Sequence, residues 1–230
     1  MQRLLLAAVA FFFVLCAGDT LPVTCGSSIK LRHMSSSVRL HSHEISYGSG
    51  SAQQSVTGLK ETVRPSTAAA SFATTFSDAE DVLQDDANSL WAIYGTVAAP
   101  CAVGAPISNA AAVRLLHKAT GKWLHTHKHR SPLSSQLEVS AYGSMEQSDA
   151  GDVWTVSTDE KLWLRDEPVR LFSPNENCFL SSSSSKKYSR PIEGQQEVAC
   201  SSKKTSDTEW ATAEGIYFDG NLAASPNDEL

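Results

Sequence analysis

Short segments in which apolar and polar residues alternate recur along most of the chain. The segments IKLRH, VRLLH and VRLFS begin at Ile29, Val113 and Val169, and each places apolar side chains two residues apart. That period is typical of a half-buried β-strand, and Gly, Ser, Asn and Pro separate such segments from one another. Beyond residue 60 a helix is predicted at most for residues 78–85. The pattern therefore predicts an all-β protein built from many short strands.

The same ordered set of anchor residues occurs three times. In each copy a leucine lies 11 positions after the first apolar residue of a strand. A glutamine comes next, a valine follows three residues after it, and a tryptophan closes the copy. The anchors are Ile29, Leu40, Gln53, Val56 and Trp91 in the first copy, Val113, Leu124, Gln136, Val139 and Trp154 in the second, and Val169, Leu180, Gln195, Val198 and Trp210 in the third. Three repeats of roughly 50 residues predict a β-trefoil, whose strands close a barrel and leave no exposed sheet edge. We expect the leucines and tryptophans to form its core.

The first repeat is longer than the other two. Val56 precedes Trp91 by 35 positions, whereas the corresponding separations in the second and third repeats are 15 and 12. The extra residues fall at about 60–88, a stretch rich in alanine, serine, threonine and acidic residues. We expect this insert to be a surface loop of a single domain rather than a second domain.

Both ends of the chain carry features of a secretory-pathway protein. Residues 1–18 combine Arg3 with an apolar run over residues 4–15 and a final stretch of small residues, which is the pattern of a cleaved signal peptide. An apolar run of about 12 residues is short for a membrane span, which makes a retained anchor the weaker alternative. The last four residues resemble the Lys/His-Asp-Glu-Leu retention signal: Asn227, Asp228, Glu229 and Leu230. We therefore expect a soluble protein of the endoplasmic reticulum (ER) lumen.

Four cysteines remain after removal of the signal peptide: Cys25, Cys101, Cys178 and Cys200. An oxidising compartment favours disulfides, and four cysteines allow three pairings. Cys25 and Cys101 stand outside the first and last strands of repeat one, which are antiparallel neighbours in a trefoil, so we expect them to be bonded. Cys178 and Cys200 flank the middle hairpin of repeat three, and we expect the second bond between them.

Charge and motifs argue against several classes of function. The formal net charge of −6 offers no attraction to nucleic acid. The sequence contains no Gly-x-Ser-x-Gly elbow, no Gly-rich phosphate loop and no Cys-x-x-Cys pair. No second apolar run is long enough to span a membrane. We expect a protein that is not an enzyme, has no cofactor or metal, and has neither nucleic acid nor a membrane as a partner.

All seven histidines fall in the first two repeats, and four of them form two pairs, His41/His43 and His125/His127. Because the spacing within each pair is i, i+2, both members share one face of a strand. Two imidazoles can bind Zn²⁺, but no further ligand lies at a matching spacing. The favoured interpretation is that the histidines hydrogen-bond neighbouring backbone at the barrel rim or line a polar groove, and a surface that responds to pH is an alternative preferred to metal binding.

The loops that follow these pairs are candidate binding surfaces for a protein or a glycan. Tyr47 and Trp123 could offer rings for stacking and Arg130 a positive charge, although the favoured alternative is that both rings complete the hydrophobic packing. The candidate binding residues are His41, His43, Tyr47, His125, His127 and Arg130.

Three stretches of the chain resemble the stromal-cell-derived factor two-like proteins. RLHSHEISYGSGSAQQSVTGL begins at Arg39, WLHTHKHRSPLSSQLEVSAYG at Trp123 and RPIEGQQEV at Arg190. Apart from the insert, the resemblance covers residues 23–217. Because the order and spacing of the stretches and the C-terminal residues all agree, the resemblance is specific.

The resemblance implies a β-trefoil over residues 19–226 that consists of three MIR motifs, at 23–95, 104–157 and 167–217. It also implies ER residence and a role in protein quality control, through association with a J-domain co-chaperone and the lumenal Hsp70. Misfolded or O-mannosylated client proteins are the further implied partners, and a lectin-like module that binds glycans is the alternative function. Two features depart from the family: the insert, and the serines at 181–183 where the other repeats have histidines.

Overall fold

The computed structural model describes residues 20–48, 50–60 and 87–219. Within these residues the chain forms twelve β-strands, all in one antiparallel sheet, and two short 3-10 helices. The expected signal peptide, most of the insert and the four C-terminal residues lie outside the described part of the chain. In the described part, no helix is both long enough and apolar enough to cross a membrane.

The elements are short, as the alternating pattern predicts. They are β1 (Ser28–His33), β2 (Val38–Ser46), β3 (Gln54–Lys60), β4 (Trp91–Gly95), β5 (Ala112–His117), β6 (Lys122–Arg130), β7 (Leu137–Tyr142), η1 (Ala150–Asp152), β8 (Trp154–Ser157), β9 (Arg170–Ser173), β10 (Cys178–Lys187), β11 (Gln196–Ser201), η2 (Ser206–Thr208) and β12 (Trp210–Ile216).

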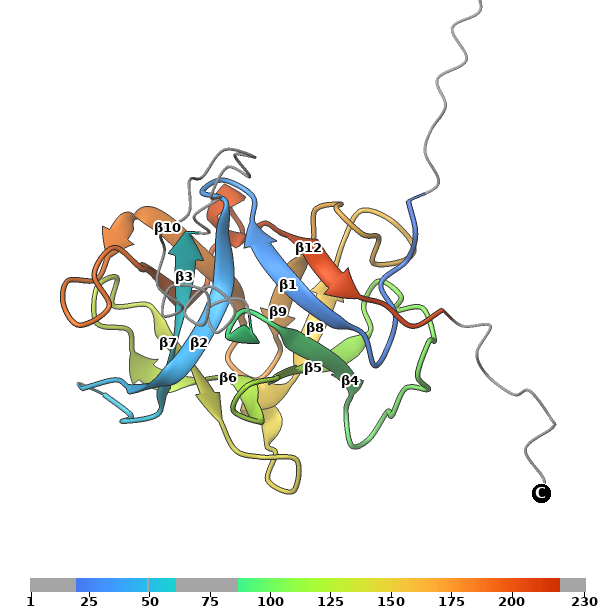
Figure 1. The fold of residues 1–230 in the computed structure, drawn as a ribbon, viewed down its shortest axis with the longest axis horizontal. Coiled ribbons are helices and arrows are strands. Elements are labelled where there is room, and N and C mark those ends of the chain that lie inside the picture. The colour runs from blue at the N-terminus through green and yellow to red at the C-terminus, as the bar shows by residue number, and fades with distance from the viewer. Residues whose placement is uncertain (1–19, 49, 61–86, 220–230) are drawn as a thin grey trace, which may run out of the picture.

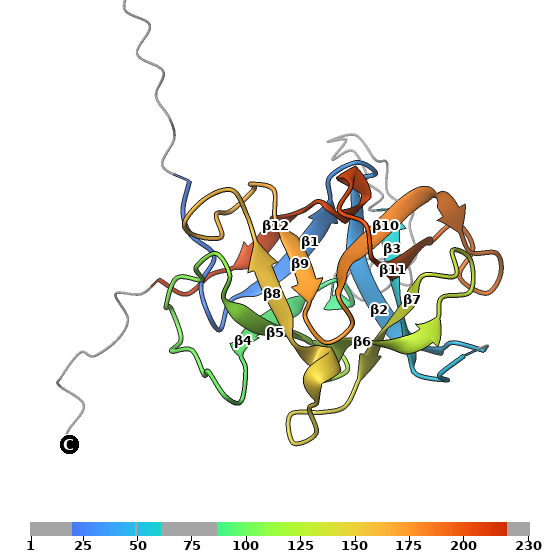
Figure 2. The same ribbon diagram turned by 180° about the vertical axis from the view of Figure 1, so that it is seen from behind.

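Six of the strands close into a barrel. β1 pairs with β4, β4 with β5, β5 with β8, and β8 with β9. The ring closes because β12 pairs with β1 and because Trp210 of β12 forms a bridge with Val169, next to β9. In Figures 1 and 2 these six strands lie together on one side of the molecule. The all-β prediction is confirmed, and closure removes the exposed edges that an open sheet would have.

The other six strands form three hairpins, β2–β3, β6–β7 and β10–β11, which gather beside the barrel (Figures 1 and 2). Their return strands β3, β7 and β11 also pair with one another in a closed triangle. The three pairings have the same register, because the residue before an anchor valine always lies opposite the residue after the anchor valine of another repeat. The pairs are Ser55 with Ser140, Glu138 with Ala199 and Glu197 with Thr57. Residues at corresponding positions of the three sequence repeats therefore have equivalent strand partners.

The anchor tryptophans and leucines are buried in the core, as predicted, and they also contact one another in the same way in each repeat. The indole nitrogen of Trp91 donates to the carbonyl of Leu40 at 2.9 Å, and Trp154 and Trp210 donate to Leu124 and Leu180 at 2.9 and 3.0 Å. Burying an indole without a partner for its N–H is costly, so these bonds explain why a tryptophan recurs at this position.

Two disulfides join the cysteine pairs that the sequence analysis expects. Cys25–Cys101 closes a loop with a sequence separation of 76, and Cys178–Cys200 one of 22. Cys178 begins β10 and Cys200 lies near the end of β11, so the second bond crosses the hairpin of the third repeat. Cys25, Cys178 and Cys200 are buried members of the core.

Candidate ligand-binding surface

His41 lies on β2, directly after the anchor Leu40. Only 2% of its surface is exposed, and its Nδ1 lies 3.1 Å from the hydroxyl of Ser89. Burial, together with the neighbouring His43 and His117, lowers the pKa of His41 to about 3. The imidazole is therefore neutral near pH 7 and acts as a hydrogen-bonding group within the fold.

His125 has the equivalent place on β6, with 4% of its surface exposed. Its Nδ1 lies 3.0 Å from a carboxylate oxygen of Asp152 and 3.5 Å from one of Asp149. Both carboxylates also accept backbone N–H groups and thereby cap η1. Within the described residues this is the one group with three potential metal ligands, and its hydrogen bonds tie β6 to the turn that leads into β8.

His127 is bonded to a carboxylate that the sequence analysis did not single out. Its Nε2 lies 2.9 Å from Glu138 of β7, a residue with no exposed surface, and Ser51 donates to the same carboxylate oxygen. Glu138 and Asp152 have little local sequence signal, because neither is adjacent in sequence to the histidine that it contacts. Pairing of β6 with β7 brings Glu138 to His127, and η1 brings Asp152 to His125. Arg130 is exposed and donates to the carbonyl of Ser135 at 3.1 Å, so it stabilises the β6–β7 turn.

Tyr47 and Trp123 are buried, which corrects the suggestion that their rings are open to a ligand. Only 6% of Tyr47 is exposed, and its hydroxyl donates to the carbonyls of Val56 and Val139 at 3.0 and 2.9 Å. Trp123 is fully buried beneath the guanidinium of Arg114, which lies 4.2 Å from the ring centroid. Both rings take the packing role that the sequence analysis favoured.

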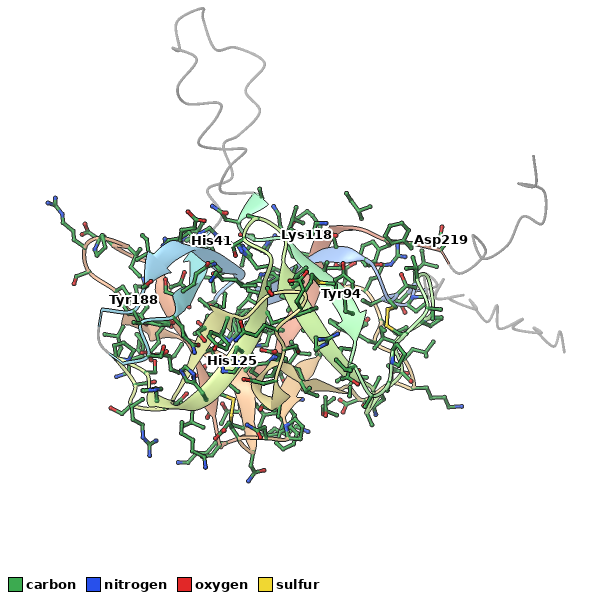
Figure 3. All side chains as sticks on the ribbon, turned by 90° about the horizontal axis from the view of Figure 1, so that it is seen from below. His41, Tyr94, Lys118, His125, Tyr188 and Asp219 are labelled. Carbon is green, nitrogen blue, oxygen red and sulfur yellow. A yellow bond between two sulfur atoms is a disulfide. The ribbon has the colours of Figure 1, made fainter. Side chains whose placement is uncertain are left out.

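A polar groove lies where the β2–β3 hairpin of the first repeat meets β6 and β7 of the second. It encloses about 640 Å³ and is lined by Glu44, Ser46, Ser51, Ala52, Gln53, Gln54, Lys122, Ala141 and Tyr142. Tyr142 is half-buried, with its ring centroid 5.1 Å from that of His125. A half-exposed ring beside amide, carboxylate and ammonium groups can hold both the apolar face and the hydroxyls of a polar ligand. Figure 3, in which the molecule is seen from below, labels His41 and His125.

A second hollow lies at the corresponding junction of the second and third repeats. Its volume is about 290 Å³, and its lining residues are Ser134, Gln136, Ser181, Ser182, Ser183, Lys186, Glu197, Ala199, Ser201, Lys203, Thr205 and Asp207. None of them is aromatic, and six of them carry a hydroxyl group. This pocket is smaller than the first groove and richer in hydroxyls.

Comparison with known proteins identifies the family. The model of the MIR domain matches residues 53–212. A stromal cell-derived factor 2-like protein from Dictyostelium discoideum is 41% identical over 86% of this chain and 84% of its own length. Stromal cell-derived factor 2-like protein 1 from Mus musculus is also 41% identical, over 90% of this chain and 84% of its own length. The chain belongs to the stromal cell-derived factor 2-like family. Family membership and the two disulfides are consistent with a protein of the secretory pathway.

Two solved structures carry the comparison further. The SDF2-like protein from Arabidopsis thaliana is 38% identical and superimposes with a TM-score of 0.74, covering 86% of this chain and 98% of its own. The Saccharomyces cerevisiae protein O-mannosyltransferase complex Pmt1–Pmt2, bound to its sugar donor, contains a region that is 28% identical, with a TM-score of 0.69. That match covers 91% of this chain but only 27% of the transferase chain, so the likeness concerns one part of that enzyme.

Proposed function

We propose that this stromal cell-derived factor 2-like protein is a non-catalytic quality-control factor of the ER lumen. In this proposal it is a β-trefoil of three MIR motifs, at about 23–95, 104–157 and 167–217. It binds a J-domain co-chaperone, and through it the lumenal Hsp70, and helps to keep misfolded clients soluble. The observation that carries the proposal is the match to family members over nearly the whole chain. The closed barrel and the equivalent registers of β3, β7 and β11 support the trefoil.

A native pull-down tests the proposed partners. The tag is placed after residue 18 so that residues 227–230 remain free at the C-terminus, and the bound proteins are identified by mass spectrometry. The control bait is an unrelated lumenal domain with the same leader, tag and last four residues. Near-stoichiometric recovery of a J-domain protein and Hsp70 with this chain alone supports the proposal, and equal recovery with both baits contradicts it.

An aggregation assay tests the proposed activity separately. We expect the purified chain to keep a heat-denatured client soluble mainly when the J-domain partner is present. Light scattering follows aggregation with the chain, with the partner, and with both together. A client that aggregates at the same rate in all three mixtures would show that the complex does not protect clients.

Glycan binding is the second candidate function, and the groove beside Tyr142 favours it. The match to a region of an O-mannosyltransferase also supports a ligand such as an O-mannosyl group on a client. We expect Tyr142→Ala to weaken binding to mannosylated glycopeptides on an array, because the variant removes the ring against which a sugar face can pack. Tyr142→Phe keeps that ring and serves as the matched control. A flat response of the native chain across the array would exclude this function.

A further inference from the structure

The residue that follows the anchor leucine differs among the three repeats. The tryptophan-to-leucine hydrogen bonds show that Leu40, Leu124 and Leu180 are equivalent. The next residue is a histidine in the first two repeats and Ser181 in the third. All three side chains are buried, and each lies on the second strand of its repeat. The same position thus holds a large ring twice and a hydroxymethyl group once.

In the first two repeats the imidazole lies against the segment that precedes the anchor tryptophan. His41 contacts Ser89 and His125 contacts Asp152, and each of these partners lies two residues before the anchor tryptophan. The fit around His125 is tight, because a Cβ added to Gly151 would lie only 2.3 Å from the ring's Cε1. Both imidazoles are buried at that position among the residues that the structure describes.

In the third repeat the corresponding space is open. Ser181 donates to the carbonyl of Ala199 at 2.9 Å and to the side chain of Gln136 at 3.2 Å, so its hydroxyl is held against the strands. The volume in front of it is the 290 Å³ pocket, which reaches Thr205 and Asp207, five and three residues before the anchor Trp210. At the position where the other repeats have a buried histidine, the third repeat thus has a serine that lines a pocket.

The lining has the chemistry of a site for a polyhydroxylated ligand. Hydroxyl groups both donate and accept hydrogen bonds, and the pocket adds the amide of Gln136, the carboxylate of Asp207 and the ammonium groups of Lys186 and Lys203. Small-molecule pockets in proteins typically enclose about 300–1,000 Å³, so this one suits a single sugar ring rather than an extended chain.

We infer that the third-repeat pocket is a binding site for one neutral hexose, and that the first two repeats have closed the equivalent position with histidine. This inference rests on the glycan-binding candidate function and assigns it a second site, distinct from the groove beside Tyr142. The first groove offers a ring for packing, whereas the third-repeat pocket binds through hydroxyl, amide and charged groups only.

The repeats themselves supply the variants that test the inference. Ser181→His introduces the residue of the other two repeats, and Ser183→His does the same at the position of His43 and His127. The control is Ser184→His, which adds an imidazole to an exposed position of β10 outside the lining. The probe is methyl α-D-mannopyranoside, titrated into the mature chain while amide NMR signals of the pocket residues are recorded.

We expect the probe to shift the amide signals of Ser181 and Thr205 in the native chain. Ser181→His should weaken this binding at least tenfold, and Ser184→His should leave it unchanged. If Ser181→His does not fold, as judged by circular dichroism and its melting curve, Ser183→His decides, with the same expected loss of binding.

Two results would overturn the inference. They also distinguish failure of the third-repeat pocket from failure of the glycan-binding function on which it rests. If the probe shifts only signals around Tyr142 and only Tyr142→Ala abolishes binding, the chain binds glycans but the third-repeat pocket is not a site. If neither the probe nor the glycopeptide array gives binding to the native chain, the glycan function fails as well. Binding that Ser181→His weakens and Tyr142→Ala leaves intact establishes the pocket.

Discussion

His33 and His117 end the strands β1 and β5 and are bonded in the same way. In each, Nδ1 contacts a hydroxyl three residues later, and Nε2 contacts a backbone carbonyl that is distant in sequence, that of Asp207 or Asn88. Each ring also lies 4.9 Å from an anchor tryptophan, His33 from Trp210 and His117 from Trp91. Burial lowers the pKa of both histidines. At the scale of residues, then, much of the histidine content builds the fold and does not face a ligand.

The buried histidines predict that the protein is destabilised by acid. The pKa of His41 is about 3 in the folded chain, against an ordinary value of 6.5. Between these values the unfolded chain binds a proton that the folded chain does not. The free energy of unfolding is therefore at its full value above about pH 6.5 and falls as the pH decreases toward 3, by at most about 1.4 kcal/mol per pH unit for one such group.

Urea titrations between pH 7 and pH 4 measure this dependence. His41→Gln removes the titrating group and keeps a side chain that can bond to Ser89, so it should reduce the slope. Gln147→Ala, at an exposed position without a titrating group, is the control and should leave the slope unchanged. Equal slopes for the native chain and His41→Gln would show that His41 does not contribute to the acid sensitivity.

At the scale of elements, the anchor glutamines connect neighbouring hairpins. The side-chain carbonyl of Gln53 accepts from Ser140, that of Gln136 from Ser181, and that of Gln195 from Thr57. Each bond joins one repeat to the next, and the donor hydroxyls are buried. A side chain that can cross between strands explains why glutamine recurs three residues before the anchor valine.

Loss of one such connection should be measurable. Gln53→Ala leaves the buried hydroxyl of Ser140 without this acceptor, and we expect it to lower the free energy of unfolding by about 1–3 kcal/mol. Gln147→Ala, at an exposed position, should change it by less than about 0.5 kcal/mol. Chemical denaturation of the two variants and the native chain provides the comparison. Indistinguishable midpoints would mean that the glutamine does not stabilise the junction.

The two disulfides should contribute unequally to stability. A cross-link restricts the unfolded chain more when it closes a longer loop, and the separations are 76 for Cys25–Cys101 and 22 for Cys178–Cys200. We expect the double alanine variants to lose roughly 4 and roughly 3 kcal/mol, respectively. Urea unfolding of both variants measures the difference. A smaller loss for the Cys25/Cys101 variant would contradict this ranking.

At the scale of the whole molecule, the barrel and the three hairpins form one sheet, so the repeats have no independent core. The buried anchor residues of all three repeats belong to a single cluster, and β12 of the third repeat pairs with β1 of the first. The groove and the pocket accordingly both lie at junctions between repeats.

The proposed location also belongs to this scale. We expect a chain that lacks residues 227–230 to be secreted, because those residues resemble a retention signal. Immunoblots of cells and medium compare the native chain, the truncated chain and a control in which the four residues are reversed. Retention of all three proteins in the cells would show that the C-terminal residues do not determine the location.

The sequence by itself determined the strand content, the threefold recurrence of the anchors and the two cysteine pairs. These features depend on local alternation and on spacing, which a single chain displays directly. The burial of the anchor leucines and tryptophans follows from the same pattern, because apolar side chains at strand period must face a core.

The tertiary structure alone decided which aromatic and polar side chains remain exposed. Tyr47 is closed off by the carbonyl of Val139, which lies 92 residues away in sequence, whereas Tyr142 remains half-exposed. Glu138 became the partner of His127 across the β6–β7 hairpin, and Asp152 of η1 became the partner of His125, 27 residues earlier in the chain. Whether Ser181 faces a pocket or a packed interior likewise depends on residues of other strands. Exposure and partnership are set by long-range contacts, and spacing along the chain does not specify them.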